Sequence, residues 1–129
     1  MSWLRGRTHA SALFASRPGL AAKLDSLRHD ASTGAPGRTA QLITARAEQI
    51  VNGAGSLSSF GTITAGEQAV IDVTEQFLVD AHGIDDGLIA RLGDHYTPAE
   101  QVAIMFHLAL ADGFTKFNRV FDVDSLEAD

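Results

Sequence analysis

The fold is decided by residues 97–120, which read TPAEQVAIMFHLALADGFTKFNRV. The Thr-Pro-Ala-Glu start fits a capping box with proline at the first helical position, so it predicts the beginning of a long helix. On a helical wheel the apolar residues surround the axis almost completely and leave only Gln101 and Asp112 on a polar edge. We therefore expect a central, buried helix, in which His107 must find a hydrogen-bond partner.

Outward from this stretch, the rest of the chain favours further helices, because no segment alternates like a strand. The apolar spacing and the capping residues predict helices after Pro18, over about 39–51, from the Thr64 capping box, and over about 86–92. The cluster of small and polar residues at 31–37 predicts a loop. Gly53, Gly83 and Gly93 are expected as left-handed residues at helix ends.

Length and composition indicate one soluble helical domain spanning residues 1–129. The chain has a mass of 13.7 kDa, 45% apolar residues, 20% charged residues and a mean hydropathy of +0.03, which is ordinary for a globular domain. We expect an all-α bundle of about six helices. No apolar run approaches the roughly 18 residues of a membrane span, so no membrane partner and a cytoplasmic location are expected.

Charge and cysteine content exclude several classes of function. The net charge of −6 divides into about +5 over residues 1–46 and about −11 over residues 47–129. Such an acidic chain is poorly suited to nucleic acid, which requires a concentrated basic surface. The chain has no cysteine, which excludes disulfides, thiolate metal sites and cysteine nucleophiles.

Two long runs in the second half of the chain resemble the carboxymuconolactone decarboxylase and AhpD-like family. They are TAGEQAVIDVTEQFLVD at 64–80 and the run from 94 to 123 that contains His95-Tyr96-Thr97 and ends near Asn118-Arg119. The run GRTAQLITARAEQIVNGAGSLSSFG at 37–61 is compatible with the first half of that family. The resemblance implies an all-α homo-oligomer with thiol peroxidase or lactone decarboxylase chemistry among its relatives.

The residues that serve the peroxidase branch are missing from this sequence. That branch has a glutamate, two cysteines three residues apart, and a histidine four residues later. The corresponding residues here are Leu42, Ala54, Leu57 and Gly61, or Gln41, Gly53, Ser56 and Phe60 if the register moves by one. A thiolate is the attacking species in that chemistry, so a thiol peroxidase is not expected.

Three side chains are candidates for catalysis. A buried His107 suits a general acid or base, with a hydrogen-bonded core histidine as the alternative. Glu75 lies at the border between the apolar and polar arcs of its helix, where an exposed, solvated glutamate is equally compatible. Tyr96 either places its hydroxyl in a cavity or packs as the apolar staple of the helix that begins at Thr97.

Three further side chains are candidates for substrate binding. They are His82, on the same stripe as Glu75, His95 before the Thr97 cap, and Arg119, whose guanidinium matches a carboxylate. Arg119 alternatively pairs with Asp122, Asp124 or a neighbouring subunit. No two histidines have the i, i+3 or i, i+4 spacing of helical metal ligands, so neither a metal nor a cofactor is expected.

Two functions from different classes remain open. The first is a non-redox enzyme of the decarboxylase, isomerase or cyclase type, in which His107, aided by Glu75 or Tyr96, acts on a small cyclic or carboxylated metabolite. The second is a non-catalytic protein that keeps the helical shell for ligand binding or for assembly. Both are compatible with a homo-oligomer.

Overall fold

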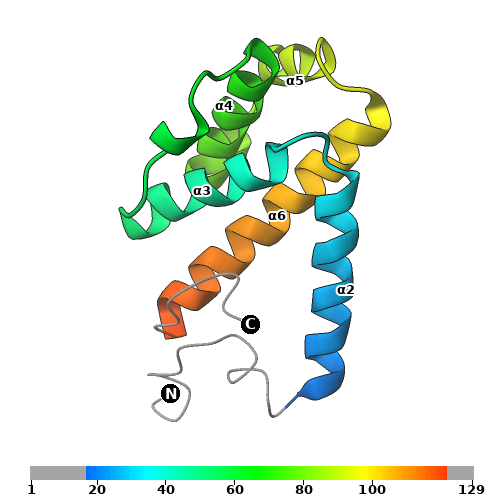
Figure 1. Cartoon of the computed structure of the whole chain (residues 1–129), viewed down its shortest axis with the longest axis vertical. Coiled ribbons are helices and arrows are strands. Elements are labelled where there is room, and N and C mark those ends of the chain that lie inside the picture. Colours follow the sequence, from blue (N-terminus) through cyan, green and yellow to red (C-terminus); the bar gives the residue numbers. More distant parts are fainter. Residues whose placement is uncertain (1–16, 122–129) are drawn as a thin grey trace.

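Residues 17–121, the part of the chain described by the computed structural model, form five α-helices and two short 3-10 helices (Figure 1). They are α2 (Pro18–Gly34), α3 (Thr39–Asn52), η1 (Ser58–Phe60), α4 (Ala65–Asp80), η2 (Ala81–Gly83), α5 (Asp86–Gly93) and α6 (Pro98–Phe121). No strand occurs in this range. The predicted all-α class is confirmed for the described residues, with five α-helices where about six were expected for the whole chain.

The helix boundaries with the strongest local signals are confirmed. At the start of α4, Thr64 and Glu67 exchange side-chain-to-backbone hydrogen bonds of 3.0 and 3.1 Å. At the start of α6, Thr97 and Glu100 do the same at 2.9 and 3.2 Å. Gly53 ends α3 in the left-handed region with φ 65°, which glycine adopts without steric cost.

The predicted loop at 31–37 is wrong over its first half, because α2 continues to Gly34. The hydroxyls of Ser32 and Thr33 donate to carbonyls three residues back, so they bond within the helix and do not interrupt it. Ala31 is buried as well. The turn itself is confined to the residues after Gly34, where Gly37 has φ 55°.

The expectation of left-handed glycines at 83 and 93 is also wrong. Gly83 lies in η2, and Gly93 is the last residue of α5; neither is among the described glycines with positive φ. The chain tightens after α4 because the Asp80 carboxylate accepts the backbone N–H of His82 at 3.0 Å. That side-chain bond replaces the glycine-based helix end that the sequence suggested.

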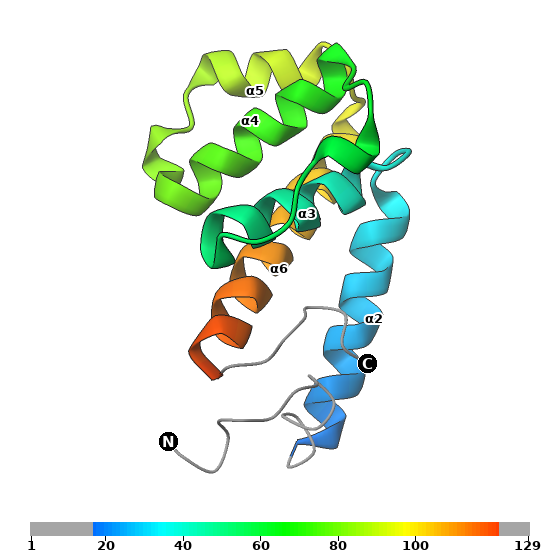
Figure 2. The same ribbon diagram turned by 60° about the vertical axis from the view of Figure 1, so that its left-hand side comes forward.

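The apolar core is centred on α3, which packs against both α4 and α6 (Figure 2). Ile43 and Ala47 of α3 are fully buried, and so are Val73 of α4 and Leu108 of α6. Burial of such aliphatic side chains is the main favourable contribution to folding. α5 packs chiefly on α4.

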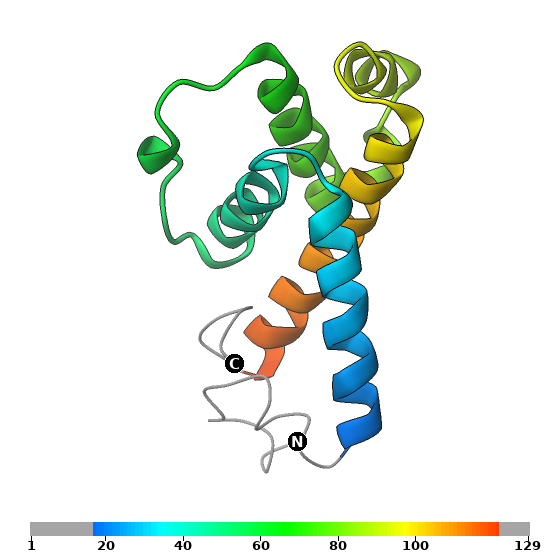
Figure 3. The ribbon, with the colours of Figure 1, turned by 45° about the vertical axis from the view of Figure 1, so that its right-hand side comes forward.

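α2 is attached to the rest of the molecule mainly through α6, and the two helices diverge toward the start of α2 (Figure 3). The two helices approach closely where Gly34 meets Ala103, since a Cβ added at Gly34 would lie 2.9 Å from that of Ala103. α6 is therefore covered by α3 on one side and by α2 on another. The predicted complete burial of α6 is wrong, because Val102 and Phe106 remain exposed on a side that no described helix covers.

Candidate functional site

His107 lies in the middle of α6 and is half-buried. Its Nε2 is 3.1 Å from Thr44 Oγ1 of α3, and the tautomer decides which of the two atoms donates. The imidazole thus links two helices of the core. It has the hydrogen-bond partner that a buried ring requires, and its catalytic role stays a prediction.

Glu75 of α4 pairs with Arg46 of α3, whose Nε is 3.1 Å from Glu75 Oε1. Arg46 also donates to Gln49 at 3.0 Å. Thr44 and Arg46 are two positions apart on α3, which is a rotation of about 200° around the helix. Glu75 and His107 therefore contact opposite borders of α3, and the structure does not bring these two predicted catalytic groups together.

Tyr96 and His95 lie side by side against the N-terminus of α4. A Cβ added at Gly66 would be 3.1 Å from both the Tyr96 hydroxyl oxygen and His95 Cβ, so the absence of a side chain there makes room for them. Tyr96 packs on the apolar core, as a staple does. Burial raises the pKa of the Tyr96 hydroxyl, and the nearby Glu67 and Glu100 carboxylates raise it further, so the phenol remains a donor at neutral pH.

The other two predicted binding residues, His82 and Arg119, are exposed. His82 lies in η2 and Arg119 in the last turn of α6. The alternative partners of Arg119, Asp122 and Asp124, lie outside the described residues. Of the six predicted site residues, His95 and Tyr96 are placed in contact, with ring centroids 6.5 Å apart.

An ionic cluster that was not predicted from the sequence surrounds Arg38, which precedes α3. Its guanidinium donates to both carboxylate oxygens of Glu67, at 2.7 and 3.0 Å, and to the carbonyls of Phe60 and Thr62. It also lies 5.5 Å from the centre of the Phe60 ring, within cation–π range. One side chain thereby fastens the segment after α3 to the start of α4.

The contacts around Arg38 strongly lower the pKa of the Glu67 carboxyl. The hydrogen bond from Arg38 lowers the pKa of the Glu67 carboxyl to about 2, with a further contribution from the Thr64 backbone N–H. The capping box identified Glu67 from sequence, but no spacing rule connects it to Arg38, 29 positions earlier. The Arg38 guanidinium makes four hydrogen bonds within the protein, which is typical of a structural clamp and not of a reactive site.

The most distinctive surface of the molecule is apolar and lies along α6. Three grooves of about 410, 380 and 260 Å³ adjoin one another there, and Val102, Phe106 and Ala109 are shared between them. Among the described residues that line them, only Gln101 and Asp30 are polar. The surface, called the α6 face below, consists of Val102, Phe106, Ala109, Gly113 and Phe117 of α6 with Leu20, Leu24 and Leu27 of α2.

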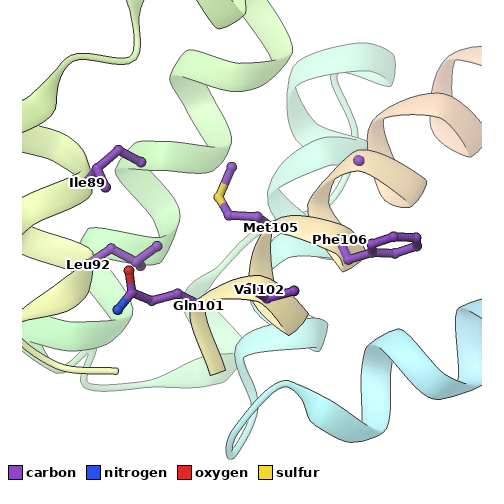
Figure 4. Close-up of a pocket in the computed structure, with 7 residues that line it drawn as sticks. Ile89, Leu92, Gln101, Val102, Met105 and Phe106 are labelled. Carbon is purple, nitrogen blue, oxygen red and sulfur yellow. The ribbon is translucent and has the colours of Figure 1, made fainter. Parts of the chain in front are cut away.

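One end of the α6 face borders α5. Figure 4 shows Ile89 and Leu92 of α5 opposite Gln101 and Met105 of α6, whereas Phe106 points away from α5. The exposed fractions of Val102 and Phe106 are 67% and 46%. None of the six predicted site residues lines any of these three grooves.

Within residues 17–121 no three His, Asp or Glu side chains are grouped as a metal site would need. Over the same residues no helix has the length and apolarity to cross a membrane. The chain matches no protein-family model, no curated protein and no solved structure at a significant level.

Proposed function

We propose that this protein is a non-catalytic helical domain that works by associating with itself through the α6 face. The observation that carries the proposal is the exposure of Val102 and Phe106 within three adjoining apolar grooves. Single exposed apolar residues are common on monomers, but contiguous apolar surfaces mark interaction sites. Packing against a second apolar surface removes this area from water.

The positions of the predicted catalytic residues also support assembly over catalysis. Acid–base chemistry needs its groups within hydrogen-bond reach of one substrate. His107 and Glu75 contact opposite borders of α3, and Glu75 is occupied by Arg46. The three apolar grooves offer a substrate no titratable group except Asp30.

Val102→Glu tests the proposal. Burying an unpaired carboxylate at an apolar contact is costly, so we expect self-association to weaken ~100-fold or more. Size-exclusion chromatography with light-scattering detection, over a range of protein concentrations, measures the mass of the assembly. Val79→Glu is the matched control, because Val79 lies on α4 outside the α6 face and is 75% exposed. A wild-type monomer at all concentrations, or equal effects of both variants, contradicts the proposal.

We propose further that the helical arrangement is of the AhpD-like type, with the thiol chemistry absent. Support comes from the three runs that carry the resemblance, which coincide with α3, α4 and α6. Those helices form the core, so the similarity concerns the packed centre of the domain. A homo-oligomer is what that family would lead one to expect.

A second candidate function is non-redox acid–base chemistry on a small cyclic or carboxylated metabolite. It is favoured by the contact of His107 Nε2 with Thr44 Oγ1, a polar pair set among apolar core residues. An imidazole titrates near neutral pH and suits proton transfer. No cofactor is needed for such a reaction.

His107→Gln separates the two candidates. If assembly is the function, the variant keeps the wild-type oligomeric mass and loses about 1 kcal/mol of unfolding free energy, because one hydrogen bond is perturbed. Native mass spectrometry of the freshly purified protein provides the readout. A small molecule that copurifies with the wild type and is lost from His107→Gln supports the enzyme instead.

A further inference from the structure

We propose that the occupant of the α6 face is a second copy of this chain, packed antiparallel so that the two α6 helices cross at Ala109 and Gly113. The inference rests on the proposed self-association and adds the partner's orientation and the point of contact. It is carried by the distribution of small and bulky side chains over the α6 face.

The small residues are in the middle of the apolar stripe. Ala109 and Gly113 are one turn apart, with Phe106 before them and Phe117 after them. A Cβ added at Gly113 meets no atom of the described residues within 4 Å, so the space in front of α6 is open there. Small residues let two helices approach to about 8 Å.

The two halves of the face have complementary shapes. Phe106 projects from the first half of the stripe, whereas the second half forms the groove of about 380 Å³ lined by Leu20, Leu24 and Phe117. An antiparallel crossing centred between positions 109 and 113 places Phe106 of each copy opposite positions 116–117 of the other. Each phenyl ring then enters the groove of the other copy, and two-fold symmetry repeats the contact.

The size of the face is appropriate to the apolar centre of a dimer. From Val102 to Phe117 the stripe is about 22 Å long at 1.5 Å per residue. With α2 beside α6 the face is about 20 Å wide, on the order of 450 Å² in projection. A stable complex buries roughly 800 Å² per partner, with a polar rim around an apolar core, and this face would supply more than half of that area.

The absence of cysteine allows a direct test with single introduced thiols. The Ala109→Cys and Gly113→Cys proteins are mixed, left until subunits have exchanged, and oxidised. Mass spectrometry then identifies the disulfide-linked dimers. In the proposed crossing, position 109 faces position 113 of the other copy, within the reach of a disulfide. Two copies of the same position are about 8 Å apart between Cα atoms, beyond the usual limit of about 7 Å.

The expected main product is therefore the mixed 109–113 disulfide, with a yield at least tenfold higher than that of either symmetric disulfide. The Val79→Cys control should give no disulfide-linked dimer. Gly113→Leu is the second variant: Gly113 is open within the protomer, so its helical circular dichroism should be unchanged while the dimer mass is lost. A wild-type dimer without the mixed disulfide, or a Gly113→Leu dimer, overturns the crossing and leaves the proposed self-association standing. A wild-type monomer overturns both.

Discussion

Leu108→Ala is expected to lower the free energy of unfolding by about 2–5 kcal/mol, the range for large-to-small changes in a packed core. Leu108 is fully buried in the cluster that joins α6 to Ile43 and Ala47 of α3. Removing its branched end loses apolar contacts and leaves a cavity that the helices fill only in part. For a chain of this size the melting temperature should fall by at least about 8 °C.

Leu110→Ala is the matched control for this prediction. Leu110 is two positions further along α6, half-buried, and lines one of the grooves of the α6 face. Its truncation should cost only about 1 kcal/mol, because less of its area is removed from water on folding. Thermal and urea unfolding at one protein concentration provides the comparison. Equal losses in the two variants would refute a core centred on α3 and α6.

Glu67→Gln is expected to remove about 2 kcal/mol of stability at neutral pH, together with the part of the acid sensitivity that the Glu67 carboxyl contributes. In the native protein the hydrogen bond from Arg38 holds the pKa of Glu67 at about 2, against an ordinary value of 4.5. A carboxyl with a lowered pKa stabilises the folded state fully above the unfolded value. The wild type should therefore lose this stability progressively as the pH falls from about 4.5 to about 2.

The expected loss of about 2 kcal/mol is smaller than the full free energy that corresponds to the pKa difference, because the Arg38 side chain is 36% exposed and its charge is screened by solvent. Glu75→Gln is the control on the same helix, since Glu75 also pairs with an arginine but is 43% exposed. It should change stability by less than about 1 kcal/mol. Urea titrations between pH 2 and pH 7 measure both variants, and a wild-type-like pH profile for Glu67→Gln would contradict the clamp.

Features set by neighbouring residues could be predicted from the sequence. The capping boxes at Thr64 and Thr97 and the left-handed Gly53 each depend on contacts within about four positions, and all three were found where expected. The all-α class followed from the same local patterns. The prediction at Gly83 was wrong because the Asp80 side chain satisfies the backbone after α4 in another way. The prediction at Gly93 was wrong because α5 is capped by Asp94 in the right-handed region, with the Asp94 N–H bonded to the Ala90 carbonyl.

Features set by distant residues could not be predicted. The Arg38 clamp joins positions 29 apart, and no period or motif encodes that pairing. The helical wheel of α6 shows which of its residues are apolar, but it does not show how many other helices pack against them. Val102 was therefore expected to be buried, whereas it is exposed. The separation of His107 from Glu75 likewise depends on α3 lying between them, which is a property of packing.

The attachment of α2 has a consequence for the order in which the chain loses its structure. Only Ala31 is buried along its 17 residues, and neither a side-chain cap nor charges in its terminal turns stabilise it. An isolated helix of this length is marginal in water. α2 is therefore a separate low-stability unit that opens while α3, α4 and α6 stay folded. In the proposed dimer, association with a second copy would couple the persistence of α2 to protein concentration, because the folded α2 forms part of the interface.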